Sequence, residues 1–319
     1  MASLTIIIPF YQKQPGVLQR ALRSISRQTF QDFDILVVDD ASPLPAEKEL
    51  QSLGAEERAR IRLIRQTNAG PGGARNTGLD NVPAASRFVA FLDSDDEWAP
   101  EHLNNAFEAL TRHDADCYWD SIDGGEEFYY HFSIAELAKS ADIVRLSDKP
   151  AIIEIPNVAS VMLQDWSFLH MSCMVIGRSL FEKVRFEPTL RLAAEDVLYF
   201  CDCALAARRV LLCENAGALR GEGVNIFHSI DNDSPQFLRQ QFNTWTALDT
   251  LEQRFSRRPQ DVAAIRLYKN RARRQALWSQ ARQLRQRRLP QFGLLAKWAL
   301  RDPAILQSVM QLAVGKLAP

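Results

Sequence analysis

The sequence has no uninterrupted apolar run of about 18 or more residues, so we expect no membrane-spanning helix. It also has no basic segment or small-residue cleavage site at its start, where LTIIIPF is typical of a strand, so no signal peptide is expected. Paired CxxC spacings are missing as well, and the five cysteines lie mostly within apolar stretches. We interpret them as buried free thiols in a reducing cytoplasm, and a zinc site is disfavoured.

Acidic residues are scarce in one part of the chain. Residues 257–301 contain thirteen Lys or Arg and a single acid, Asp261, although the whole chain has a net charge of −1. The chain therefore combines an acidic body with a basic C-terminal region. With 319 residues, 46% hydrophobic and 24% charged, it is typical of a soluble globular protein. Its length suits one large domain, or a core of about 220 to 250 residues plus an appendage.

Residues 1–100 alternate strand and helix patterns. Strand patterns lie at residues 4–9 and in FDILVVDDAS, IRLIRQ and FVAFL; helix patterns lie at 15–28, 47–53 and 74–79. Strands separated by helices predict a mostly parallel, Rossmann-like α/β sheet, in which ligands bind beyond the carboxyl ends of the strands. From residue 234 onward helical patterns dominate, so we expect a helical C-terminal appendage.

Carboxylates gather directly after the apolar strand FVAFL. Asp93, Asp95 and Asp96 lie within four residues of one another. Because neighbouring carboxylates repel each other, their full ionisation requires a compensating cation. Hard oxygen ligands prefer Mg²⁺ or Mn²⁺, which usually bind through one or two carboxylates and substrate phosphates. The cluster points to a metal between aspartate and a diphosphate; the alternative is a solvated acidic turn before a helix.

Two further elements follow strands of the same predicted sheet. In VVDDAS, Asp40 either starts an Asx turn or accepts a hydrogen bond from a nucleotide ribose or base. In AGPGGARNTG, a glycine-rich backbone and Arg75 could approach a phosphate closely. Each signal is weak alone, but three such elements at successive strand ends favour a nucleotide-binding site.

Together these segments carry a resemblance to a known family. TIIIPFYQ, SISRQTF, VVDDAS, NAGPGGARNTG and FLDSDDEWAP resemble, over residues 4–100, the nucleotide-sugar half of family 2 glycosyltransferases, inverting enzymes of the GT-A fold. The likeness continues more loosely to about residue 230 through AAEDVLYF and NIFHS. IPFYQKQPGVLQRAL further resembles glucosyltransferases of bacterial succinoglycan-type exopolysaccharide assembly, which use UDP-glucose and extend a lipid-linked oligosaccharide.

The resemblance implies roles at the donor site. Asp95 is implied as a ligand of Mn²⁺ or Mg²⁺, and His228 as a second metal ligand or a contact of the diphosphate. Asp93 and Ser94 are implied to lie toward the ribose and the donor sugar. The residues implied to border the nucleobase or the phosphates are Pro9, Tyr11, Asp40 and Arg75.

The resemblance also implies a general base at the acceptor hydroxyl, a task that suits a carboxylate. Asp196 is the first choice and Glu195 the alternative; without the family context, the pair would be the acidic first turn of a helix. Trp166 is either an acceptor platform, because aromatic faces pack well on sugar rings, or a core residue.

The basic region, residues 257–317, interleaves apolar residues with arginines. Such helices adsorb to anionic membrane surfaces, where each cation adds roughly 1 kcal/mol. The alternatives are packing against the acidic body and contact in a homodimer; nucleic-acid binding is not expected. Adsorption would suit a lipid-linked acceptor.

We therefore predict a metal-dependent hexosyltransferase that is cytoplasmic and peripheral on the inner face of the membrane. Residues 1–233 would form the GT-A domain, with a nucleotide-sugar half at 1–100 and an acceptor half at 101–233. Residues 234–319 would form a basic amphipathic helical region. The alternatives are a sugar nucleotidyltransferase, whose Gly-rich basic loop after the first strand is not convincingly present, and a non-catalytic nucleotide-sugar-binding scaffold.

Overall fold

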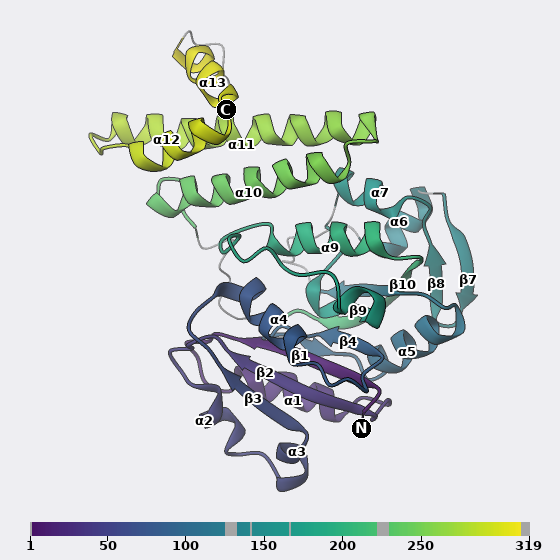
Figure 1. Ribbon diagram of the computed structural model, residues 1–319. Helices are drawn as coiled ribbons and strands as arrows, with labels where there is room; N and C mark the ends of the chain where they lie inside the picture. The colour runs from purple at the N-terminus through teal and green to yellow at the C-terminus, as the bar shows by residue number, and fades with distance from the viewer. Residues whose placement is uncertain (1, 125–132, 141, 166, 222–229, 314–319) are drawn as a thin grey trace. The chain divides into compact units, whose positions relative to one another are not determined.

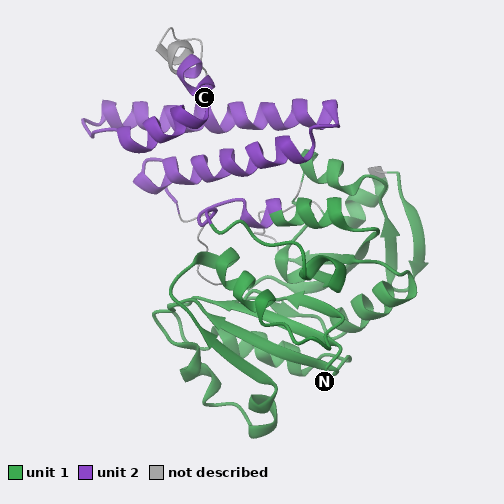
Figure 2. Ribbon diagram, viewed as in Figure 1, with its two compact units in different colours: residues 1–188, 199–224 green, residues 189–198, 225–319 purple. Residues whose placement is uncertain are grey.

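The computed structural model describes residues 2–124, 133–140, 142–165, 167–221 and 230–313 (Figure 1). The chain forms two compact units (Figure 2): unit 1 is residues 1–188 with 199–224, and unit 2 is residues 189–198 with 225–319. Unit 1 holds the sheet, and unit 2 holds the C-terminal helices. The division into functional domains at residue 233 stays a prediction.

Unit 1 is built on a ten-stranded sheet with the order β3-β2-β1-β4-β9-β6-β10-β8-β7, and β5 pairs with β10. The strands are β1 (Leu4–Phe10), β2 (Phe33–Asp39), β3 (Ile61–Arg65), β4 (Phe88–Phe91), β5 (Glu97–Trp98), β6 (Cys117–Asp123), β7 (Val144–Asp148), β8 (Ala151–Glu154), β9 (Met174–Gly177) and β10 (Val210–Leu219).

The predicted fold class is confirmed, because most strands run in one direction. β3, β2, β1 and β4 are mutually parallel, and β6, β10 and β7 share their direction. β9, β8 and the short β5 run the opposite way. The carboxyl ends of β1, β2 and β4 therefore meet at one edge, as the strand and helix pattern predicts.

Helices connect these strands. Those of unit 1 are α1 (Val17–Ser26), α2 (Ala46–Leu50), α3 (Ala55–Ala59), α4 (Gly70–Asp80), α5 (His102–Arg112), α6 (Ile134–Ser140), α7 (Val158–Gln164), the 3₁₀ turn η1 (Met171–Cys173) and α8 (Arg178–Phe181). Helix α9 (Glu195–Ala206) begins in unit 2 and continues in unit 1.

Helix α4 begins earlier than the sequence predicts. The expected helix covers residues 74–79, but α4 starts at Gly70, so the glycine-rich segment is helical rather than a loop. Pro71 is compatible with this, because the first N–H groups of a helix need no partner within it. A Cβ on Gly78 would lie 2.5 Å from Cγ2 of Ile7, so glycine allows α4 to pack closely on β1.

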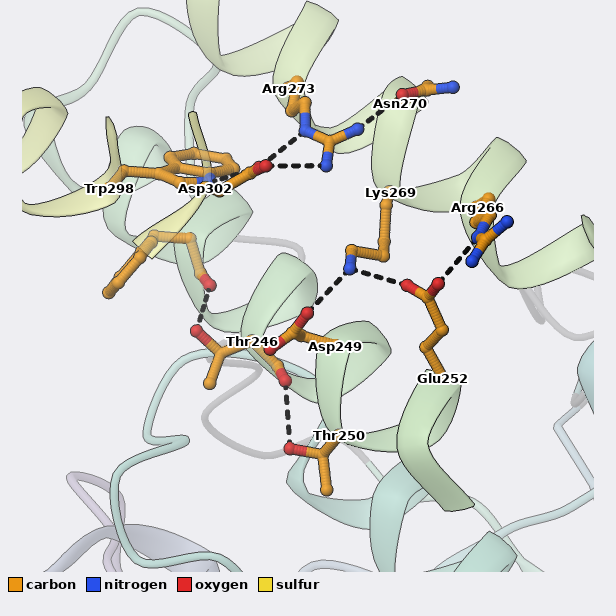
Figure 3. A network of polar contacts seen from close by, with 11 residues as sticks. Thr246, Asp249, Thr250, Glu252, Arg266, Lys269, Asn270, Arg273, Trp298 and Asp302 are labelled. Atoms are coloured by element: carbon orange, nitrogen blue, oxygen red, sulfur yellow. Dashed lines mark hydrogen bonds and ion pairs between the residues drawn. The ribbon is translucent and has the colours of Figure 1, made fainter. Parts of the chain in front are cut away.

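Unit 2 is a helical bundle of α10 (Pro235–Arg254), α11 (Pro259–Arg285), α12 (Phe292–Arg301) and α13 (Ala304–Ala313). Its core is aromatic: Trp298 is fully buried beside Phe242 and Trp245. Figure 3 shows ion pairs of the same bundle, between Lys269 of α11 and Asp249 and Glu252 of α10, and between Arg273 of α11 and Asp302 directly after α12. None of the described helices combines the length and the apolar character that a membrane crossing requires.

Candidate functional site

The acidic cluster lies in the turn after β4, at the edge where the parallel strands end. Phe91 and Leu92 are completely buried, and the N–H of Leu92 donates to the carbonyl of Ile7, which extends the pairing of β4 with β1. Asp93 and Asp96 are then held together by the turn, because the N–H of Asp96 donates to the carbonyl of Asp93. The carboxylates are thus fixed on a rigid strand end.

Asp93 is oriented by Arg75. Nη2 of Arg75, in α4, lies 2.6 Å from Oδ1 of Asp93, and the side chain of Arg75 is only 5% exposed. Burial opposes ionisation of Asp93, but the charges of Arg75 and His170 outweigh it, so the pKa of Asp93 lies below its ordinary value. Arg75 also lies over the ring of Phe186, with its guanidinium carbon 5.4 Å from the ring centroid. Asp93 is therefore an ionised carboxylate with a fixed position.

Asp96 is buried and faces Ser172 in η1. Oγ of Ser172 donates to Oδ2 of Asp96 at 2.5 Å, and the N–H of Gly221 donates to Oδ1 at 3.0 Å. Burial raises the pKa of Asp96, and the neighbouring charge of Asp93 adds to this, although His170 and these hydrogen bonds act in the opposite direction. Gly221 is a necessary glycine, because a Cβ there would lie 1.5 Å from the carbonyl oxygen of Asp95.

Ser172 connects four parts of the site. In addition to its bond to Asp96, its Oγ accepts from the N–H of Asp93 at 3.0 Å, and its N–H donates to Nδ1 of His170 at 3.3 Å. Its carbonyl accepts from Nε1 of Trp98 at 2.6 Å. Ser172 is fully buried, so water does not compete for these hydrogen bonds. This residue was not identified from the sequence.

His170 is a second site residue that the sequence did not reveal. Its Nδ1 lies 3.6 Å from Oδ2 of Asp96 and accepts from the N–H of Ser172. Ligand atoms of Asp93, Asp96 and His170 lie within 4.8 Å of one another. The sequence offers one signal for His170, the strand pattern CMVI at residues 173–176, which follows it. In the structure this segment contains β9, which pairs antiparallel with β4 and therefore begins beside the end of β4.

Asp95, the predicted metal ligand, lies in the same turn. Burial raises its pKa to about 7, with further contributions from the charges of Asp96 and Asp93. Neighbouring carboxylates repel each other when all are ionised, and a bound divalent cation would remove this repulsion. Oxygen donors together with one imidazole suit Mn²⁺ or Mg²⁺. The donor set that the structure brings together, Asp93, Asp96 and His170, therefore fits such an ion, and Asp95 as a metal ligand stays a prediction.

Asp40 organises the chain at the end of β2. Oδ1 accepts from the N–H of Ala69 and from Nε2 of Gln66, each at 2.7 Å, and Oδ2 accepts from the N–H of Gly70 at 2.9 Å. Asp40 thus caps α4 from a separate strand, which explains why the helix can begin in a glycine-rich segment. Its predicted contact with a nucleobase stays a prediction.

Gln12 links the ends of β1, β2 and β4. Its Nε2 donates to Oγ of Ser94 at 3.1 Å, and its backbone N–H donates to Oγ of Ser42 at 2.8 Å. The structure therefore brings the segments of Ser94 and Asp40 together through a glutamine that the sequence analysis did not single out. Pro9 and Tyr11, on either side of Phe10 at the end of β1, are half-buried.

Glu195 and Asp196 form the first turn of α9 and belong to unit 2. Oδ1 of Asp196 accepts from the N–H of Val197 at 2.8 Å. Both side chains are half-buried, and their role as a base stays a prediction. His228 and Trp166, the other two predicted site residues, lie outside the described residues.

Sequence comparison finds relatives of this chain among known proteins. The model of the family described as Glycosyl transferase family 2 matches residues 5–185. The succinoglycan biosynthesis protein ExoW of Rhizobium meliloti (strain 1021) is 66% identical over 318 residues, which cover 100% of both chains. An uncharacterized glycosyltransferase of Nostoc sp. is 31% identical over 230 residues, which cover 70% of this chain and 66% of that one.

Two solved structures share the fold. TarS 1–349 of S. aureus in complex with UDP-GlcNAc has a TM-score of 0.59 and 17% identity, covering 86% of this chain and 70% of that chain. The mannosyltransferase PcManGT from Pyrobaculum calidifontis in complex with GDP-Man and Mn²⁺ has a TM-score of 0.57 and 19% identity, covering 98% of this chain and 86% of that chain. At these identities the likeness concerns the fold alone.

Proposed function

Because this chain belongs to glycosyl transferase family 2 and has the GT-A fold, we propose that it transfers a hexose from a UDP-hexose to a saccharide acceptor. The observation that carries the proposal is the convergence of Asp93, Asp96 and His170 at the ends of parallel strands. UDP-GlcNAc in a structural neighbour supports a UDP-sugar donor, and glucose is our first candidate for the sugar. Likeness to a succinoglycan biosynthesis protein supports a role in exopolysaccharide assembly.

The acidic cluster would hold Mn²⁺ or Mg²⁺. Asp93, Asp95, Asp96 and His170 are the proposed ligands in the described chain, and His228 remains a proposed further contact. The ion supplies positive charge for the diphosphate leaving group when it is bound. Mn²⁺ in the structure of a neighbouring mannosyltransferase supports a metal cofactor.

The protein's own groups would position the reactants. Arg75 holds Asp93 in a fixed orientation, and Asp93 and Ser94 would face the ribose and the donor sugar. Pro9, Tyr11 and Asp40 would border the nucleobase. These contacts would orient the anomeric carbon for attack.

In the transfer step, the acceptor oxygen forms a bond to the anomeric carbon while the bond from that carbon to the diphosphate oxygen breaks. Asp196 would accept the proton of the acceptor hydroxyl, with Glu195 as the alternative base. A single displacement of this kind inverts the anomeric configuration. Trp166 would pack against the acceptor sugar.

The proposed acceptor is a lipid-linked oligosaccharide, so the protein would act at the inner face of the membrane. Residues 1–233 would form the transferase domain, and the basic region 257–317 would contact anionic lipid. A homodimer is a further proposal. The cytoplasmic, peripheral location follows from the acceptor and the basic region together.

The proposal is tested by calorimetric titration of UDP and UDP-glucose, with and without Mn²⁺, into wild-type protein and Asp95→Ala. We expect metal-dependent binding to wild type and its loss in the variant. Asp148→Ala is the matched control, because Asp148 also ends a strand but its side chain is 87% exposed. Absence of binding to UDP, UDP-glucose and other nucleotides would refute the donor site, and binding of the donor without any transfer would favour the scaffold alternative. Pyrophosphate release from UTP and a hexose 1-phosphate would indicate a nucleotidyltransferase instead.

A further inference from the structure

Helix α12 is apolar on two faces. One face packs into the core of unit 2 through Leu294, Leu295, Trp298 and Ala299. On the other face Phe292, Ala296 and Leu300 follow one another at four-residue spacing, and Phe292 and Leu300 are 63% and 86% exposed. A helix that is apolar on both faces is usually covered on both, so this outer face needs a partner.

The turn before α12 continues this surface. Residues 284–289 are all exposed, and Leu289 is 84% exposed. The base of the turn is held in place by Gln291, whose N–H donates to Oε1 of Gln280 at 2.9 Å and whose Nε2 donates to the carbonyl of Pro235 at 2.8 Å. Its exposed leucine is therefore presented by an anchored turn at the end of the bundle (Figure 1).

Four cations accompany the exposed apolar side chains. They are Arg285, Arg287 and Arg288 in or next to the turn, and Lys297 on α12. The sequence has no acid between Asp261 and Asp302. Within the described part of the chain, none of these four cations forms an ion pair. We call Leu289, Phe292, Ala296, Leu300 and these cations the α12 surface.

Several other cations of the bundle are paired within it. Nζ of Lys269 lies 2.7 Å from carboxylate oxygens of both Asp249 and Glu252, and Arg273 pairs with Asp302 at 2.6 and 2.8 Å (Figure 3). The α12 surface therefore carries positive charge that no ion pair of the described residues offsets, whereas part of the charge of α11 is paired within the bundle.

We propose that the α12 surface is the place where the protein binds an anionic phospholipid membrane. Leu289, Phe292 and Leu300 would enter the boundary between headgroups and acyl chains, and the cations would remain among the phosphates. This inference deepens the proposed function, and it rests on it for the lipid-linked acceptor. A second copy of the same surface is a poor partner, because the four cations of each copy would repel those of the other. A nucleic acid is also a poor partner, because it would contact the cations but leave the three large apolar side chains exposed.

The test is co-sedimentation of the full-length protein with vesicles of phosphatidylcholine alone or mixed with phosphatidylglycerol. Arg287→Gln with Arg288→Gln should weaken binding to the anionic vesicles about fivefold for each arginine, hence roughly 25-fold together. Leu289→Gln with Leu300→Gln should weaken it at least tenfold by removing buried apolar area. Leu267→Gln is the matched control, because Leu267 on α11 is 67% exposed but lies outside the α12 surface; its binding should change less than about twofold.

Equal binding of wild type to neutral and anionic vesicles would overturn the proposal, as would wild-type binding in both double variants. A dimer of the wild type that dissociates in the double variants, measured without vesicles, would overturn it in favour of a second copy. Calorimetric UDP affinity of the same proteins separates the two hypotheses. Lost vesicle binding with intact UDP affinity leaves the transferase proposal standing, and intact vesicle binding without UDP affinity contradicts only the donor site.

Discussion

The strand-end site of unit 1 and the helical bundle of unit 2 both concentrate charge, but they treat it in opposite ways. In unit 1, Asp93, Asp95 and Asp96 converge in one turn, and the pKa values of two of them are raised by burial and mutual repulsion. In unit 2, Arg266, Lys269 and Arg273 of α11 pair with carboxylates of the same unit. Neighbouring carboxylates with raised pKa values, such as Asp95 and Asp96, indicate a site for a positively charged ligand. Charges that pair with each other inside a bundle indicate a structural role.

The largest change in activity is expected at the proposed base, in the first turn of α9. Asp196→Asn should lower the transfer rate about a hundred- to ten-thousandfold, because the amide cannot accept the hydroxyl proton. Donor affinity should be unchanged. Initial rates and calorimetry on the same preparation measure both, and wild-type rates in this variant would transfer the assignment to Glu195 or to another residue.

A second test concerns the paired charges of the bundle. Arg273→Ala should destabilise the protein by about 3 to 5 kcal/mol, because it leaves the buried carboxylate of Asp302 without its partner. Arg266→Ala is the control: its side chain is 68% exposed, so loss of its pair with Glu252 should cost about 1 kcal/mol or less. Urea unfolding measures both, and equal losses would contradict the structural role given to the buried pair.

The hydrogen bonds of Ser172 allow a test of the strand-end site without removal of a carboxylate. Ser172→Ala should weaken Mn²⁺-dependent UDP binding about 10- to 100-fold, in line with the loss of groups that orient metal ligands. Ser121→Ala is a matched control, since Ser121 is also buried but its Oγ has no hydrogen-bond partner in the structure. If both variants bind equally well, Ser172 does not position the site.

The smallest predicted effect is a pH dependence of metal binding. Because the pKa of Asp95 is raised to about 7, a proton competes with the metal below that pH. Mn²⁺ affinity should therefore rise about tenfold from pH 6 to pH 8, and Asp95→Asn should flatten this profile. Without metal, the free energy of unfolding has the opposite pH dependence.

In the native state Asp95 keeps its proton up to about pH 7, whereas in the unfolded state it loses the proton near pH 4. The free energy of unfolding should therefore fall as the pH rises from about 4 to 7. Melting curves with and without Mn²⁺ measure both trends.

Much of unit 1 could be predicted from local patterns. The strand and helix alternation of residues 1–100 gave the order of β1 to β4, and the acids after β2 and β4 marked the edge where the site lies. The helix expected at residues 74–79 begins at Gly70 instead, because its start depends on capping by Asp40, which is 29 and 30 residues away from its partners. A long-range cap leaves no local trace in the sequence.

Local patterns in the amino-acid sequence are enough to predict the sheet class, the carboxylates at strand ends and the contrast between an acidic body and a basic C-terminal region. These follow from periodicity and composition, which are local properties. The packing of the folded chain brings His170 and Ser172 to Asp93 and Asp96, and it leaves Phe292 and Leu300 on the second apolar face of α12 exposed. The chain comes back to the end of β4 through β9, which runs antiparallel to it, and Ser172 thereby meets Asp93, which lies 79 residues earlier. Hydrophobic periodicity is a local property and does not predict such a long-range contact.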